Sequence, residues 1–116
     1  MHHRPPTDII AGVPISFQEH ITILDCPINN VTMTSAIEMI TERLDGDHND
    51  QVCFVNADCA NIAYKNEQYR NVIQAAYLVF ADGIGMKIGG KILNRQIRDN
   101  VNGTDMFPLL CEALNG

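Results

Sequence analysis

The sequence lacks tryptophan, and only 6% of its 116 residues are aromatic. It has little positive charge: eight Lys and Arg stand against fourteen Asp and Glu, for a formal net charge of −6. Binding nucleic acid without sequence preference needs a basic field, so this composition argues against that class of protein. No apolar run approaches the roughly 18 residues of a membrane-spanning helix.

The spacings that hold metal ions are also missing. The four histidines form no cluster with Cys or Asp at metal-ligand spacing, and the four cysteines contain no CxxC pair. Cys53 and Cys111 lie in apolar runs. We therefore expect the cysteines to be small buried hydrophobes in a reducing compartment, and we expect no metal site and no cofactor.

What is present is an ordinary globular composition, 46% hydrophobic and 19% charged, at a length that suits one domain. Residues 1–20 are weakly patterned and predict an extended arm. Apolar patterning predicts strands at 21–24, 52–55 and 78–81. A break at 25–27 ends the first of these, and 28–31 follows it as a second strand or a turn. The first expected helix runs from Thr32 or Thr34 to Leu44, and further helices are expected through 60–64 and over 67–76. Another helix is expected from near Gly85 to about 93. The last is expected over 104–114, with Pro108 in its first turn.

Helices that alternate with short, continuously apolar strands indicate an α/β fold with a mainly parallel, Rossmann-like sheet and flanking helices. The sequence stops at Asn115-Gly116, where a helix would end and a further strand would begin. We therefore expect an apparently truncated domain, with residues 21–116 as its N-terminal portion.

Polar residues follow two of the expected strands. Asn56 comes after 52–55 and Asp82 after 78–81, and ligands of open parallel sheets bind at the carboxyl ends of the strands. If both strands belong to one sheet, Asn56 and Asp82 lie at the same edge. Gly83 allows a sharp turn there. Asp82 is then either a general base or only the cap of the following helix.

Two other patterns leave alternatives open. Gly83, Gly85 and Gly89 form a loose relative of the dinucleotide fingerprint, with Asp99 or Asp105 as the acid for a ribose. The stretch 100–105 is either a loop with Thr104 as helix cap or a binding segment for sugar or phosphate. Lys87 and Lys91 form a solvated face or pair with a diphosphate.

Three segments together resemble the WecG/TagA/CpsF glycosyltransferase family. They are residues 54–63 (FVNADCANIA), 78–85 (LVFADGIG) and 98–110 (RDNVNGTDMFPLL), in matching order and spacing. The resemblance implies an enzyme that transfers an N-acetylmannosamine-type sugar from a UDP donor to a lipid diphosphate-linked N-acetylglucosamine. Such enzymes act in teichoic-acid, capsule and exopolysaccharide synthesis. They invert the anomeric centre without a metal and work at the cytoplasmic face of the membrane as peripheral proteins.

By the same resemblance, Asp82 is the catalytic base and Asn56 lines its pocket. The other residues expected to bind substrate are Gly83, Gly85, Asn100, Gly103, Thr104 and Asp105. Two positions depart from the family pattern, since Phe54 stands where a Thr is common and Asn100 where an Arg is common. These departures concern the contacts to the acceptor.

Family members are about twice as long, and the remaining half carries much of the UDP site and a basic membrane-contacting tail. We therefore expect these 116 residues alone to be inactive. We also expect homo-oligomers, because the strand that should follow the last helix is missing and apolar groups such as Phe107, Leu110 and Leu114 are left with fewer partners. The alternative is a truncated, non-catalytic remnant that binds a sugar nucleotide or a partner protein.

Overall fold

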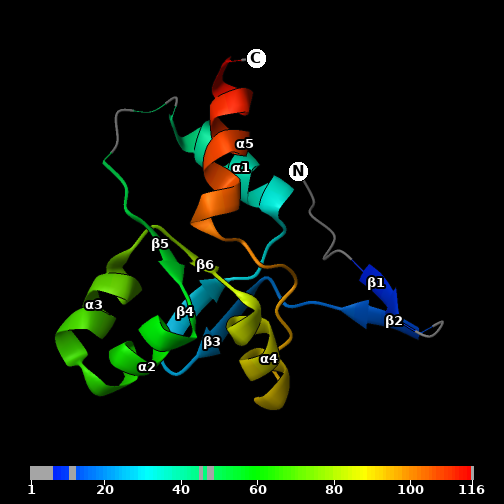
Figure 1. Cartoon of the computed structure of the whole chain (residues 1–116), viewed down its shortest axis with the longest axis vertical. Helices are drawn as coiled ribbons and strands as arrows, with labels where there is room; N and C mark the ends of the chain where they lie inside the picture. The colour runs from blue at the N-terminus through cyan, green and yellow to red at the C-terminus, as the bar shows by residue number, and fades with distance from the viewer. Residues whose placement is uncertain (1–6, 11–12, 45, 47–48, 116) are drawn as a thin grey trace.

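The computed structural model of the chain describes residues 7–10, 13–44, 46 and 49–115. Its fold is mixed α/β, as the sequence predicts (Figure 1). The strands are β1 (Thr7–Ile10), β2 (Val13–Ser16), β3 (His20–Ile23), β4 (Cys26–Asn29), β5 (Val52–Val55) and β6 (Leu78–Ala81). The helices are α1 (Met33–Leu44), α2 (Ala57–Lys65), α3 (Glu67–Ala75), α4 (Ile84–Ile92) and α5 (Gly103–Asn115).

The centre of the molecule is the parallel pair of β5 and β6, in which Val55 lies opposite Ala81. Strand β4 lies beside β6 (Figure 1). A hydrogen bond to a side chain connects these two strands: the backbone N–H of Val79 in β6 donates to the side-chain Oδ1 of Asn29 in β4 at 2.8 Å. Strands β3 and β4 form a separate antiparallel two-stranded sheet, so β5 and β6 are the parallel pair among the described strands.

The β3–β4 turn lies one residue earlier than the sequence predicts. Leu24 and Asp25 both have positive φ, at 48° and 66°, which is the conformation of a tight two-residue hairpin turn. Cys26 and Pro27, expected in the break, instead begin β4. Proline is tolerated here because its missing N–H requires only that one ladder position stay unpaired.

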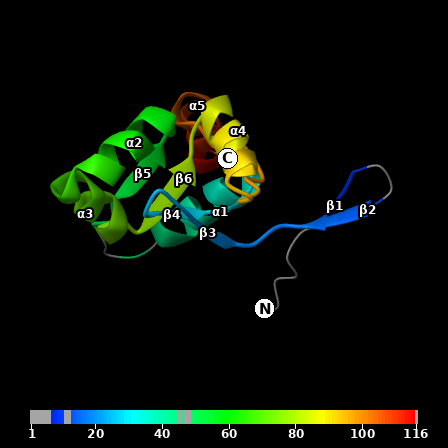
Figure 2. The same cartoon turned by 90° about the horizontal axis from the view of Figure 1, so that it is seen from below.

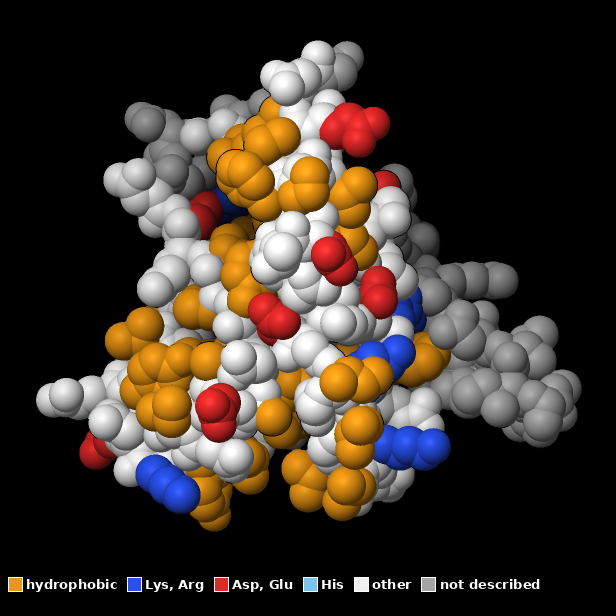
Figure 3. Space-filling view, viewed as in Figure 1, with side chains coloured by type: hydrophobic (Ala, Val, Ile, Leu, Met, Phe, Trp, Pro, Cys, Tyr) orange, Lys and Arg blue, Asp and Glu red, His pale blue; other side chains and the backbone are white. Residues whose placement is uncertain are grey.

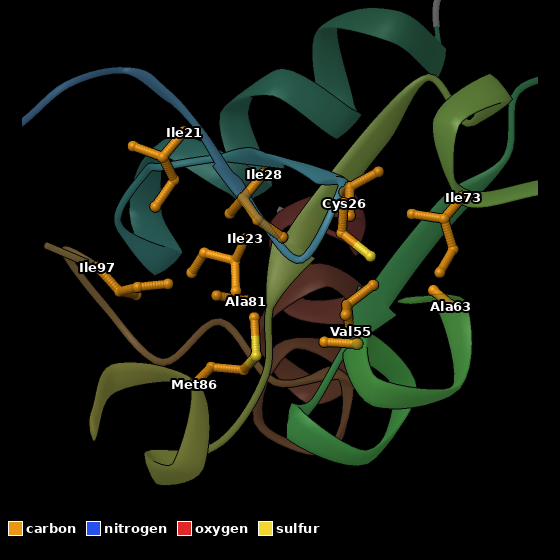
Figure 4. Close-up of a cluster of buried hydrophobic side chains, with 12 residues drawn as sticks. Ile21, Ile23, Cys26, Ile28, Val55, Ala63, Ile73, Ala81, Met86 and Ile97 are labelled. Atoms are coloured by element: carbon orange, nitrogen blue, oxygen red, sulfur yellow. The ribbon is translucent and has the colours of Figure 1, made fainter. Parts of the chain in front are cut away.

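The core has two parts, one on each face of the central strands. Residues of β6 alternate between them: Val79 and Ala81 belong to the first cluster, and Leu78 and Phe80 to the second. Figure 4 shows the first cluster, where side chains of the β3–β4 hairpin meet those of α2, α3 and α4. Helices α1 and α5 cover the second cluster. Burial on both faces explains why β5 and β6 read as continuous apolar runs.

Residues 7–10 and 13–16, within the segment predicted to be an extended arm, form the antiparallel pair of β1 and β2. Figure 2 shows this hairpin to one side of the helices and the central sheet. The expected arm also includes residues 1–6 and 11–12, which lie outside the described residues. The arrangement leaves the central layers to residues from about 20 onward.

Two expectations for the C-terminal helix are wrong. Helix α5 begins at Gly103, so Pro108 is in its second turn rather than its first, and it removes the N–H that would pair with the carbonyl of Thr104. Cys111 is exposed on α5, whereas Cys26 is buried. An apolar run in an amphipathic helix buries only one face, and Cys111 lies on the other.

Candidate functional site

The parallel pairing of β5 and β6 brings Asn56 and Asp82 to one edge of the sheet. Val55 and Ala81 are opposite each other in the register, and each is followed directly by one of these polar residues. The backbone N–H of Asp82 donates to the carbonyl of Val55 at 2.9 Å, which extends the pairing by one more bond. The two side chains therefore emerge from neighbouring strand ends.

Asp82 is half-buried and holds a carboxylate that is not used to stabilise the fold. Within the described ranges this carboxylate accepts no hydrogen bond from another residue. The expected alternative, in which Asp82 caps the next helix, is wrong. The N-cap of α4 is Gly83, which has no side chain to offer. The carboxylate is thus available to a ligand at the sheet edge.

Gly83 turns the chain sharply after Asp82. Its φ is +98°, a conformation that other L-residues rarely adopt. The N–H of Gly83 donates to Oδ1 of Asn100 at 2.6 Å. The next residue, Val101, donates its own N–H to the carbonyl of Ala81 at 2.8 Å. These two bonds fix the loop around Asp82 and bring Asn100 beside it.

Asn56 has a structural role as well as its place at the edge. Its Oδ1 accepts the N–H of Cys59 at 2.8 Å, which caps α2. Gly85, which is expected to bind substrate, lies close to α2. A Cβ at this position would stand 3.3 Å from the Cβ of Ala57. Gly85 therefore allows α4 and α2 to approach each other behind the strand ends.

The N-terminus of α5 lies over β5. A Cβ on Gly103 would stand 3.6 Å from the ring of Phe54, and that ring packs on Phe80 with centroids 5.9 Å apart. Phe54, one of the two departures from the family pattern, thus supports the start of α5. Thr104 is exposed in the first turn of the helix.

Asn102, not Thr104 as expected, caps α5. Its Oδ1 accepts the N–H of Asp105 at 2.8 Å, and its Nδ2 donates to Oδ2 of Asp105 at 2.9 Å. The expectation failed because Asn102, Thr104 and Asp105 are all good cap residues, so their residue types alone do not determine where the helix begins. Asp105 therefore faces Asn102 at the helix start.

Both candidate ribose acids have partners within the fold. Oδ2 of Asp99 accepts the N–H of Met33 at 2.9 Å, at the start of α1, and Asp105 is paired with Asn102. Neither carboxylate lies at the end of a strand beside a free glycine loop. This arrangement does not favour the dinucleotide alternative.

Sequence reasoning missed Asn30, which is 3% exposed and ties three segments together. Its Nδ2 donates to the carbonyls of Gln18 and Gln96, and its Oδ1 accepts the N–H of Arg98, each at 2.8 Å. Two of these bonds hold the segment that leads to Asn100 and the site. No sequence signal separates Asn30 from an ordinary loop asparagine.

Two cavities of the described fold are lined by residues other than Asp82. One, of about 220 Å³, is lined by Arg43, Tyr77 and neighbours. The other, of about 330 Å³, includes Asn30 and Arg98. Among the residues that the structure describes, no three His, Cys, Asp or Glu side chains are arranged to hold a metal ion.

Comparison with known proteins gives two findings. Residues 21–116 match the family described as "Glycosyl transferase WecG/TagA/CpsF family". The chain is also similar to the N-acetylglucosaminyldiphosphoundecaprenol N-acetyl-beta-D-mannosaminyltransferase of Bacillus subtilis (strain 168), with 26% identity over 95 residues. The alignment covers 81% of this chain but only 37% of that relative.

Proposed function

The chain belongs to the WecG/TagA/CpsF glycosyltransferase family, and on that premise we propose that it carries the catalytic base of a sugar transferase. The proposed reaction moves an N-acetylmannosamine-type sugar from a UDP donor to an N-acetylglucosamine linked to a lipid diphosphate. The name of the Bacillus relative describes such an acceptor and such a transferred sugar. The product would serve the synthesis of a cell-surface polysaccharide.

The observation that carries this proposal is the position of Asp82. Its carboxylate stands at the end of β6, is half-buried, and accepts no hydrogen bond from the described residues. In the proposed step it removes the proton from an acceptor hydroxyl as the oxygen attacks the anomeric carbon. The bond from that carbon to the UDP oxygen breaks at the same time, so the configuration inverts and UDP leaves with the electron pair.

The surrounding residues are assigned to substrate contacts in the same proposal. Asn56 keeps its amide nitrogen for a ligand, because only its oxygen is used to cap α2. Gly83 and Gly85 keep the backbone beside Asp82 free of side chains. Asn100, whose oxygen accepts from Gly83, has its amide nitrogen left for the acceptor.

At the start of α5, Gly103, Thr104 and Asp105 are assigned to the sugar or the diphosphate. A helix N-terminus favours an anion, and the Gly103–Phe54 contact keeps this one close to the end of β5. Because the aligned residues cover only 37% of the relative, we assign to the chain only part of a complete site. Residues 21–116 would act as the N-terminal portion of the transferase domain, at the cytoplasmic face of the membrane. No described helix has the length and apolarity to cross a membrane.

The proposal is tested with Asp82→Asn in a version of the chain extended to the length of the relative. We expect turnover to fall by about 10²–10⁴-fold, while the melting temperature and donor binding stay nearly unchanged because the amide keeps the shape. Asp58→Asn is the matched control, since Asp58 is an exposed residue in the first turn of α2. Near wild-type turnover in Asp82→Asn would contradict the proposal. UDP-sugar binding without any transfer by the unsubstituted protein would favour a non-catalytic remnant instead.

Transfer is further expected to need no divalent metal. The sequence has no DxD pair near the strand ends, where Asp58 and Asp82 stand alone, and Mg²⁺ or Mn²⁺ beside a diphosphate needs oxygen ligands of that kind. Rates in EDTA and in added Mn²⁺ should agree within about twofold, as for any reaction without a metal-held diphosphate. Activity that disappears in EDTA and returns with Mn²⁺ would contradict this part.

A further inference from the structure

Helix α4 presents an apolar stripe to solvent. Ile84, Ile88 and Ile92 are 68%, 56% and 78% exposed, while Met86 and Gly90 of the same helix are buried. With 3.6 residues per turn, the three isoleucines lie on the side opposite Met86 and Gly90. A helix at the surface of a globular protein normally places polar residues on that side. The stripe is therefore a candidate contact surface.

The stripe lies in the most basic part of the chain. Between Asp82 and Asp99 there is no acidic residue, while four of the eight basic residues of the chain lie there. They are Lys87, Lys91, Arg95 and Arg98. Lys87 and Lys91 are one turn apart and flank the isoleucines along one side of α4. In Figure 3, hydrophobic and basic side chains lie next to each other over α4.

We propose that α4 is a docking surface for an anionic lipid surface, with the isoleucines at the acyl boundary and the lysines at the headgroup phosphates. A short helix with an apolar face and Lys at its border binds in this way. The fourteen acidic residues all lie outside residues 83–98, so an anionic surface attracts this segment and repels much of the remaining chain.

Charge also argues against a second copy of the chain as the occupant. Two copies that pair their α4 stripes about a two-fold axis present the same surface to each other. Lys87 and Lys91 of one copy would then lie near the same residues of its partner. Like charges across an interface cost binding free energy, whereas lipid phosphates neutralise them.

The docking surface on α4 adds a membrane contact to the proposed function, and this part of the inference rests on that proposal. Ile84 is two residues from Asp82, so a lipid surface under α4 holds the end of β6 near the headgroups. The acceptor in the proposed reaction carries its diphosphate at that level. The chain therefore has a membrane contact of its own, apart from the basic tail that the family resemblance implies.

The test is sedimentation of the 116-residue chain with vesicles of phosphatidylcholine, alone or mixed with phosphatidylglycerol. We expect binding to the mixed vesicles that weakens with salt and little binding to phosphatidylcholine alone. The double variant Ile88→Ser, Ile92→Ser should lower the partition coefficient by about tenfold or more. Lys87→Gln and Lys91→Gln should each lower it by about fivefold.

Matched controls use exposed residues on other helices: Ile62→Ser with Val72→Ser for the isoleucines, and Lys65→Gln for the lysines. Circular dichroism checks that all variants keep the fold. The proposal would be overturned if the chain binds neither vesicle type or binds both equally well. It would also be overturned if the control variants lose as much vesicle binding as the α4 variants. An oligomer, measured by light scattering, that the Ile88 and Ile92 variant separates into monomers would overturn it as well. No donor or acceptor is present in this assay, so its failure leaves the Asp82→Asn result unaffected.

Discussion

Asparagine side chains make many of the long-range polar contacts in this fold. Asn29, Asn30 and Asn100 each bind the backbone of a segment distant in sequence, while Asn56 and Asn66 cap helices. A neutral amide offers both a donor and an acceptor, and burying it costs less than burying a charge. The loop beside Asp82 is therefore fixed by amide contacts, and the carboxylate stays available.

The position of the candidate base could be predicted, but the contacts that hold it could not. Asp82 and Asn56 each follow an apolar run, and parallel pairing alone places them at one edge. The role of Asn30 depends on Gln96 and Arg98, which are far away in sequence. A single sequence carries no pattern for such pairs, because many exposed loops contain the same residues.

Tyr69 gives a pH-dependent prediction at the scale of one residue. Its hydrogen bond with Cys59, together with burial, raises the pKa of Tyr69 to about 12 from the ordinary value of 10. Because folding raises this pKa, the protonated Tyr69 stabilises the folded chain. This contribution to the free energy of unfolding is fully present below about pH 10 and is lost as the pH rises toward 12. Tyr69→Phe should cost about 1 kcal/mol or less near neutral pH, and this difference should shrink above pH 10.

Urea denaturation at a series of pH values measures this difference. Tyr64→Phe is the control, because Tyr64 is an exposed residue of α2. Its free energy of unfolding should differ little from that of the unsubstituted chain near neutral pH. A difference between Tyr69→Phe and the unsubstituted chain that stays constant from pH 8 to 12 would contradict the assignment.

The elements differ in how far their sequences determined them. The strands β5 and β6 were predictable because burial on both faces leaves four apolar residues in a row. The start of α5 was not, since several cap residues compete between 100 and 105 and the contact of Gly103 with Phe54 decides between them. The β1–β2 hairpin has no alternating pattern that its sequence reveals.

Two neighbouring glycines of α4 give opposite predictions. A Cβ at Gly89 would meet open space, whereas one at Gly90 would stand 2.5 Å from the carbonyl oxygen of Arg95 and 2.9 Å from Cγ1 of Ile97. Gly89→Ala should stabilise the chain by about 0.5–1 kcal/mol through helix propensity. Gly90→Ala should destabilise it by about 2 kcal/mol or more, since the backbone of Arg95 cannot move easily.

Chemical denaturation of the two variants side by side measures both effects. Each variant is the control of the other, because they make the same chemical change in adjacent positions of one helix. Similar stabilities for Gly89→Ala and Gly90→Ala would show that α4 does not pack on the 95–97 segment as described.

At the scale of the whole molecule, the two sheet faces have different surroundings. Helices α2, α3 and α4 cover one face and α1 and α5 the other, so the strand ends with Asn56 and Asp82 open between two layers. The radius of gyration is 14.7 Å, compared with about 13 Å for a compact chain of this length. The β1–β2 hairpin, which lies apart from the helices in Figure 2, contributes to this difference.

Helix α5 carries a second exposed apolar surface, formed by Phe107 and Leu114 at 69% and 56% exposure with Cys111 between them. With 3.6 residues per turn these three lie on one side, and the acidic Asp105 and Glu112 lie on the opposite side. This surface is free of charge, unlike that of α4, so a second copy can cover it without bringing like charges together. Leu110, expected to share in it, is instead half-buried in the second core cluster.

The chain is therefore expected to self-associate through α5. Size exclusion with light scattering should detect dimers or larger species, and Phe107→Ser with Leu114→Ser should shift them to monomers because the apolar contact is lost. The Ile88→Ser, Ile92→Ser variant serves as the control and should keep the oligomer, since its substitutions lie on α4. Calorimetric titration of the unsubstituted chain should show weak or absent UDP binding, because the proposal assigns it only part of the donor site. A monomer that binds a UDP-sugar tightly and transfers it would contradict both expectations and show a working enzyme within these 116 residues.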